Sequence, residues 1–301
     1  MLELAETMSA SSFLIAGSGW EGAVLMTLAG AWMGRLMGGL IQHMARSAGY
    51  PSSHYASFET DGRWLARLPV AGHFARPRGA RSRRAFCLEA LAGIAFLACW
   101  ILFPPAKAVC GALFVLALIG ATFIDFDHMI IPDLFTTGLA LACIALSAFV
   151  PALHGIGPPG AFACVRSCAA ALLGLAIGSA LALWISVIGE WVFDKEVLGF
   201  GDVKFLGAIG AFCGWQGAAF SLFGGALAGA AALIAAEVCR RAFGKNSVQL
   251  FHVESANGEQ GKLGLGAQFP FGPTLAAAAA AYFFALHPLV DRFLSCYAPI
   301  F

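Results

Sequence analysis

The chain has 301 residues, of which 59% are hydrophobic and only 12% are charged. Soluble domains carry roughly a quarter charged residues, so this composition excludes an ordinary soluble protein, and the low charge with 26 Phe excludes a disordered chain. The 18 Lys and Arg against 17 Asp and Glu leave a net charge of +1, which provides no basic surface for nucleic acid. We therefore expect a protein that contacts membrane lipid and binds no nucleic acid.

Several apolar segments are long enough to cross a bilayer, which takes about 20 mainly apolar residues in a helix. In chain order these segments are 20–42, 86–103, 108–124, 134–153, 167–189, 205–236 and 263–286. The first two contain the interior charges Arg35 and Glu89. The stretch 205–236 is too long for one span, and residues 214–217 interrupt it, so we expect helices over about 200–213 and 217–239. The sequence predicts an all-α, polytopic membrane protein with about eight transmembrane helices.

The loops predict how these helices are oriented. The first ten residues contain two Glu and no basic residue, which differs from a cleavable signal peptide. The segment 43–85 carries eight Arg against two acidic residues, and the positive-inside rule places it in the cytoplasm. The loop 240–267 contains four basic residues, which predict the same side. Eight helices would then leave both termini outside.

Nine Cys are present, an odd number, and most of them lie within apolar runs. No pair has the spacing of a zinc knuckle, and the basic segment 43–85 contains no Cys. We interpret the Cys as small packing residues and predict no metal site.

Acidic residues lie at the ends of two predicted spans. The segment 123–133, FIDFDHMIIPD, ends a charge-free helix with Asp125, and the segment 198–205, LGFGDVKF, opens another with Asp202. The predicted orientation places both residues at the cytoplasmic face. Each alone can be a helix cap or a marker of the water interface. Together the two carboxyl groups can share one proton. The ionised group can then activate a water molecule while the protonated group donates its proton to a carbonyl oxygen. Peptide hydrolysis without a metal or a nucleophile requires this pair of roles.

These motifs resemble those of the type 4 prepilin peptidases, a family of Gly-x-Gly-Asp membrane aspartic proteases. Asp125 is followed seven residues later by Pro and Asp, as in that family. The family's Gly-x-Gly-Asp-x-Lys is matched by Gly199, Gly201, Asp202 and Lys204, and its Phe-Gly-Pro by FPFGPTLA at 269–276. The resemblance covers about residues 86–290.

The resemblance implies an endopeptidase that removes the basic leader of type IV prepilins or type II secretion pseudopilins. The cut follows a Gly at the cytoplasmic face of the bacterial inner membrane. Asp125 and Asp202 would be the catalytic pair, and proteolysis would need no cofactor. The expected substrate-binding residues are Gly199, Gly201, Lys204 and Asp133; the two glycines remove side chains where an extended substrate would approach.

The N-terminal region departs from the family pattern. Bifunctional members also methylate the new N-terminus with S-adenosylmethionine, and they usually carry two Cys-x-x-Cys pairs in the first cytoplasmic loop. The segment 34–51 keeps Gly34 and a basic cluster but little else, and the Cys pairs are missing. We therefore divide the chain into 1–85, an N-terminal helix and basic loop that form a degenerate methyltransferase region, and 86–301, the peptidase domain. S-adenosylmethionine is expected only if the transferase is active.

Other functions fit parts of the same pattern. Intramembrane carboxylates and Gly-broken helices also suit a proton-coupled carrier, although no internal repeat is found. A non-enzymatic pilus assembly factor is a second alternative. The oxygen-rich segment with Asp125, Asp127, His128 and Asp133 could hold Mg²⁺ or Ca²⁺, which is a third.

Overall fold

The computed structural model describes residues 19–47, 69–70, 83–157, 160–194, 198–243 and 270–297, which form helices and no strand. In chain order the elements are α2 (Gly19–Ser47), α4 (Arg83–Leu102), α5 (Pro105–His128), η3 (Leu134–Gly138), α6 (Leu139–Phe149), η4 (Pro151–His154), α7 (Ala161–Phe193), α8 (Phe200–Phe243), α9 (Gly272–Ala281), η6 (Tyr282–Leu286) and α10 (His287–Tyr297). Six helical segments of this part are long and apolar enough to cross a membrane. The chain is an all-α, polytopic membrane protein, as predicted.

The expected interruption of the long apolar stretch is present in α8. Gly214 has φ 76° and ψ 175°, a conformation outside the helical region that separates two helices. Glycine accepts a positive φ without steric cost, which explains the residue at this point. The six candidate spans count α8 once, and the apolar helix over Leu134–Phe149 is shorter than they are. The number of eight transmembrane helices stays a prediction.

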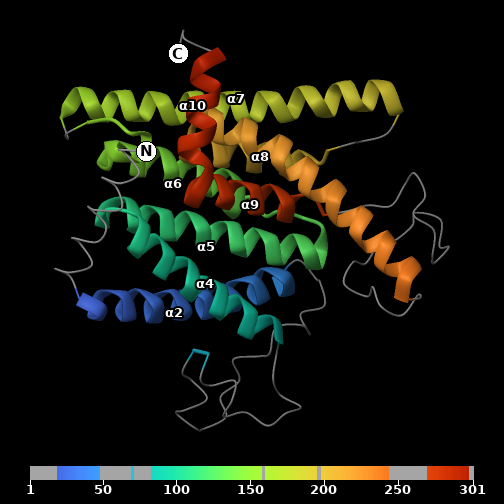
Figure 1. The fold of residues 1–301 in the computed structure, drawn as a ribbon, viewed down its shortest axis with the longest axis horizontal. Helices are drawn as coiled ribbons and strands as arrows, with labels where there is room; N and C mark the ends of the chain where they lie inside the picture. The colour runs from blue at the N-terminus through green and yellow to red at the C-terminus, as the bar shows by residue number, and fades with distance from the viewer. Residues whose placement is uncertain are drawn as a thin grey trace.

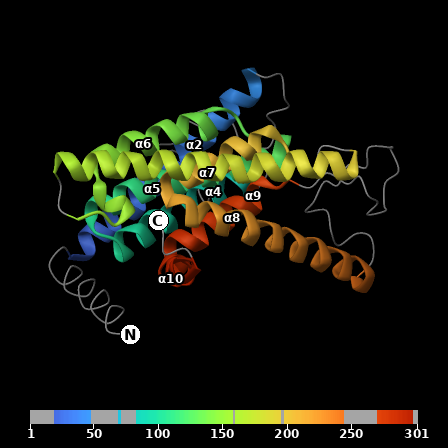
Figure 2. The ribbon, with the colours of Figure 1, turned by 90° about the horizontal axis from the view of Figure 1, so that it is seen from above.

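The helices form one bundle in which most axes run in a similar direction (Figures 1 and 2). Helices α2 and α7 lie on opposite sides of α5 in Figure 1. Helix α8 packs extensively against α7 and α9, and α4 packs mainly against α2 and then α5. Helix α10 lies crosswise to the others, and Figure 2 views it almost along its axis. This crosswise end was not expected, since the sequence predicts one last helix over 263–286.

Aromatic side chains pack where α5, α8 and η6 meet. The rings of Phe114 and Phe212 are stacked with their centroids 4.1 Å apart, and Phe283 packs edge-on against both. Phe103 stacks on Phe283 with a centroid distance of 4.6 Å. Aromatic pairs of this kind add about 0.5–1.5 kcal/mol each beyond the area they bury. The cluster joins the two helices that carry the expected catalytic residues.

Helices α7 and α8 approach each other through small residues. A Cβ built on Gly174 would overlap the carbonyl oxygen of Gly210, and one built on Gly210 would overlap that of Gly174. Gly178 lies in the same way against the backbone of Leu206. Small residues allow helices in lipid to gain van der Waals contact between their backbones.

Helices α2 and α4 form a second close pair. A Cβ on Gly30 would lie 2.6 Å from the carbonyl oxygen of Ala92, so only glycine fits this crossing. The two interior charges of these spans, Arg35 and Glu89, are both buried and lie 3.6 Å apart as an ion pair. The second carboxylate oxygen of Glu89 accepts a hydrogen bond of 2.6 Å from the backbone N–H of Val70. Each buried charge of the pair is thus compensated inside the protein.

The loops that set the predicted orientation lie mostly outside the described residues. Only residues 69–70 between α2 and α4 are described, and no residue between α8 and α9 is described before 270. The cytoplasmic placement of 43–85 and 240–267, the location of both termini, and the division of the chain at residue 85 stay predictions.

Candidate active site

Asp125 lies in the last turn of α5, where the charge-free helix ends. Its side chain is buried, with the residue 5% exposed. The helix stops after His128 because Met129 adopts the left-handed conformation, and the Met129 N–H donates 2.9 Å to the carbonyl oxygen of Asp125. This cap holds the turn that carries the carboxylate.

The Phe-Gly-Pro motif meets Asp125 from the other end of the chain. The backbone N–H of Gly272, the first residue of α9, donates 3.0 Å to Oδ2 of Asp125. A Cβ on Gly272 would lie 2.7 Å from the same oxygen, so any larger residue would displace the carboxylate. Pro273 follows within the first turn, where a missing N–H costs no hydrogen bond. The motif therefore supplies a backbone donor at a helix N-terminus, which favours a carboxylate in front of it.

Asp202 reaches the same end of the bundle from the first turn of α8. A Cβ built on Gly201 would lie 3.7 Å from Cβ of Ile131. Ile131 also packs against Gly272. The Asp202 carboxyl group is within electrostatic range of Asp125. The structure thus brings the two expected catalytic residues together, although 77 positions of chain separate them.

The Gly-x-Gly preceding Asp202 leaves open space on one side of the carboxyl group. A Cβ on Gly199 would make only an ordinary contact, 3.7 Å from Oδ2 of Asp202, and Gly199 is exposed. The backbone N–H of Asp202 donates 3.0 Å to the Gly199 carbonyl oxygen, which forms the turn that starts α8. The site is therefore buried on the side of Asp125 and accessible on the side of Gly199.

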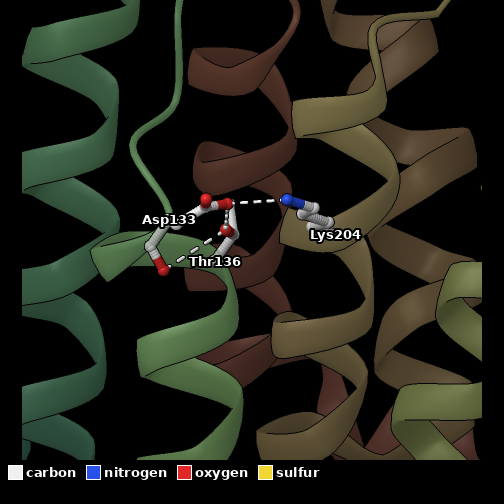
Figure 3. A network of polar contacts seen from close by, with 3 residues as sticks. All are labelled: Asp133, Thr136 and Lys204. Carbon is white, nitrogen blue, oxygen red and sulfur yellow. Dashed lines mark hydrogen bonds and ion pairs between the residues drawn. The ribbon is translucent and has the colours of Figure 1, made fainter.

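Two residues expected to bind substrate contact each other (Figure 3). The Lys204 Nζ donates 2.7 Å to Oδ1 of Asp133, and Thr136 Oγ1 donates to the same carboxylate at 3.5 Å. Lys204 also lies over the Phe200 ring, 5.0 Å from its centroid. The hydrogen bond and charge of Lys204 lower the pKa of Asp133 below its ordinary value. The contact joins the start of η3 to the first turn of α8.

The remaining acidic residue of this segment, Asp127, points to a different neighbour. It forms an ion pair with Arg84 of α4, and its side chain is only 3% exposed. Asp133 is 75% exposed and bound to Lys204. The carboxylates considered as a metal site thus face different partners. Nowhere in the described residues do three His, Cys, Asp or Glu lie close enough together to hold a metal ion.

Sequence reasoning missed three contacts of this site. The Phe-Gly-Pro motif was recognised, but its N–H donor to Asp125 was not, and Ile131 and Arg84 were not singled out. The Gly-Pro pair at a predicted helix start was the available signal for the first of these. A lone Ile and a lone Arg carry no comparable signal in the sequence.

Residues 112–234, which include both Asp125 and Asp202, match the type IV leader peptidase family. This part of the chain is therefore similar to the type IV leader peptidases. No solved structure matches the chain.

Curated relatives of this chain carry the name prepilin leader peptidase/N-methyltransferase. The one from Pectobacterium carotovorum subsp. carotovorum is 33% identical over 134 residues, 43% of this chain and 42% of its own length. The one from Myxococcus xanthus (strain DK1622) is 32% identical over 160 residues, 51% of this chain and 44% of its own. A relative from Burkholderia pseudomallei (strain 1026b) is 29% identical over 217 residues, 70% of this chain and 57% of its own. The chain spans about half the length of these relatives, or less.

Proposed function

We propose that this chain is a membrane aspartic endopeptidase that removes the basic leader of type IV prepilins or type II secretion pseudopilins. One observation carries the proposal: three motifs from separate parts of the chain converge on one pair of carboxyl groups. Asp125 accepts the Gly272 N–H and lies within electrostatic range of Asp202. The match of residues 112–234 to the leader peptidase family and the names of the relatives suggest the substrate class.

In the proposed mechanism the two carboxyl groups share one proton and hold a water molecule between them. The ionised carboxylate takes a proton from the water as its oxygen attacks the scissile carbonyl carbon, and the protonated partner donates to the carbonyl oxygen. A tetrahedral intermediate results. Its collapse breaks the C–N bond: the proton taken from water passes to the leaving amine, and a hydroxyl group of the intermediate returns a proton to the partner carboxylate, which restores the shared proton. The Gly272 N–H keeps the Asp125 carboxylate in place through both steps.

The substrate would approach from the side of Gly199, which is exposed. Asp133 keeps 75% of its side-chain surface exposed, so its carboxylate faces the path of a basic leader while Lys204 holds it in position. We place this end of the bundle at the cytoplasmic face of the bacterial inner membrane, in agreement with the Arg-rich segment 43–85. The products are a free leader and a pilin with a new N-terminus.

The test is a cleavage assay in detergent or native membranes, with a prepilin whose basic leader ends in Gly. Asp125→Asn and Asp202→Asn should each lower the rate about 10²–10⁴-fold, because each removes one proton-transfer group. Asp194→Asn is the matched control, since Asp194 is exposed at the end of α7 and should keep full activity. A fully active Asp125→Asn or Asp202→Asn enzyme would refute the pair. A folded wild-type protein that cuts no prepilin would favour the carrier or the assembly factor.

Methylation of the new N-terminus is a second candidate activity, because the relatives are named N-methyltransferases as well as peptidases. S-adenosylmethionine would be its methyl donor. Incubation of the cleaved pilin with this compound and the chain should raise the product mass by one methyl group. The assay should use pre-cleaved product and the Asp202→Asn variant, so that methylation is measured independently of proteolysis.

A further inference from the structure

The ion pair between Arg84 and Asp127 connects two parts of the molecule that the proposed mechanism leaves separate. Arg84 lies in the first turn of α4 and Asp127 in the last turn of α5. The Asp127 side chain is 3% exposed, and that of Arg84 is 40% exposed. The carboxylate is therefore the desolvated partner, and it depends on compensation from inside the protein.

Asp127 belongs to the same helical turn as Asp125. That turn ends α5 and is closed by the Met129 N–H, which donates to the carbonyl oxygen of Asp125. The Asp125 carboxylate must also meet the Gly272 N–H at 3.0 Å. A displacement of the turn that carries Asp127 would move Asp125 with it, because only one residue separates them in the helix.

Helix α4 is a firm attachment for this turn. It crosses α2 at Gly30 and Gly34, where an added Cβ would clash with the backbone of α4. Directly beside Gly34, Arg35 of α2 and Glu89 of α4 form a buried ion pair. The α2–α4 pair is thus fixed internally, and the ion pair of Arg84 with Asp127 ties it to the end of α5.

We propose that Arg84 is a positioning residue of the peptidase site, which acts by fixing the Asp127 turn of α5 and through it Asp125. This inference rests on the proposed function and gives the N-terminal helix pair a role in proteolysis. Arg84 does not touch substrate in this proposal. Its loss should therefore lower kcat and leave KM unchanged.

The experiment measures kcat and KM for prepilin cleavage in four variants: Arg84→Gln, Arg84→Lys, Asp127→Asn and the double variant Arg84→Gln/Asp127→Asn. We expect Arg84→Gln to lower kcat about tenfold to a hundredfold with KM within about twofold, because small misplacements of a catalytic group have effects of this size. The double variant should regain most of the loss, because it removes the buried charge that Arg84 compensates. Arg84→Lys should keep an intermediate kcat. Arg166→Gln, an exposed change on α7, is the control.

Hydrogen exchange of the amides at the end of α5 gives a readout that needs no activity. Exchange there should be faster in Arg84→Gln and restored in the double variant, while α7 exchanges unchanged. Unaltered kcat, an effect on KM alone, no recovery in the double variant, or unaltered exchange would each overturn the inference. If the wild type cleaves no prepilin, the proposed function fails, and the exchange result by itself decides whether Arg84 holds the turn.

Discussion

The ammonium group of Lys204 lies 2.7 Å from the carboxylate of Asp133, although 71 positions of sequence separate the two residues. Both were expected to bind substrate, and in the structure they bind each other. Their contact joins the segment that follows Asp125 to the turn that carries Asp202. The ion pair therefore links the two segments that carry the proposed catalytic residues.

Removal of one charge of this pair should reduce cleavage, and exchange of the two should restore it. Lys204→Met or Asp133→Asn should lower kcat/KM about twofold to tenfold, because an exposed ion pair is weak but adjoins the catalytic turn. The double variant Asp133→Lys/Lys204→Asp should recover most of this loss. Steady-state cleavage of one prepilin by all four proteins is the measurement. A double variant less active than both single variants would show that each residue contacts the substrate separately.

Gly272→Ala should abolish cleavage without loss of the fold. The new Cβ would lie 2.7 Å from Oδ2 of Asp125 and force the carboxylate away from its backbone donor. We expect a loss of about a hundredfold or more in kcat. Gly224→Ala is the matched control, because its Cβ would meet only side chains at 3.5 Å or beyond. Wild-type cleavage by Gly272→Ala would mean that the hydrogen bond to Asp125 is dispensable.

Substitutions at the crossing of α7 and α8 should affect stability. Gly174→Ala or Gly210→Ala would place a methyl group into the facing carbonyl oxygen, and we expect a destabilisation of about 1–3 kcal/mol. Thermal unfolding in detergent measures the effect. Gly157→Ala, at a position with no atom within 4 Å of the new Cβ, should melt like the wild type. Equal melting temperatures for all of these proteins would contradict the close approach of the helices.

The stability of the chain should fall in acid because of His154. Burial, assisted by the charge of Lys107, lowers the pKa of His154 from 6.5 to about 4. Between pH 6.5 and pH 4 the unfolded chain binds a proton at His154 and the folded chain does not. The contribution of neutral His154 to folding stability is therefore complete above pH 6.5 and is lost as the pH falls toward 4. The Tm should decrease between pH 7 and pH 4.5. His154→Gln, which can still bond to Ser147, should reduce that decrease by roughly 5 °C.

The outline of the fold was predictable because a bilayer dictates the length and composition of its helices. The break at Gly214 was predicted for the same reason, since the apolar stretch exceeds one span. The predicted positions of the helix ends were less accurate. Helix α7 covers Ala161–Phe193, whereas the expected span was 167–189, because a helix continues past Arg166 and Glu190 as readily as through apolar residues.

The proximity of Asp125 and Asp202 was predictable, but most contacts of the candidate site were not. Asp125 and Asp202 lie at one end of the bundle because their helices run in opposite directions, which the sequence indicates. The Gly272 hydrogen bond and the ion pair of Arg35 with Glu89 depend on which helices are neighbours. Pattern and periodicity describe the faces of a single helix, so they give no information about pairs that lie on different helices.

The kink at Gly214 divides α8 into arms of unequal length. The arm over 200–213, which carries Asp202, is roughly 20 Å long, whereas the arm over 217–243 is roughly 40 Å long. A bilayer core is about 30 Å thick, so the shorter arm cannot cross it completely. The two arms start from the same bend, so the arm that carries Asp202 is about half as long as the other. The turn that carries Asp202 is therefore positioned by packing against neighbouring helices and not by a full span of its own.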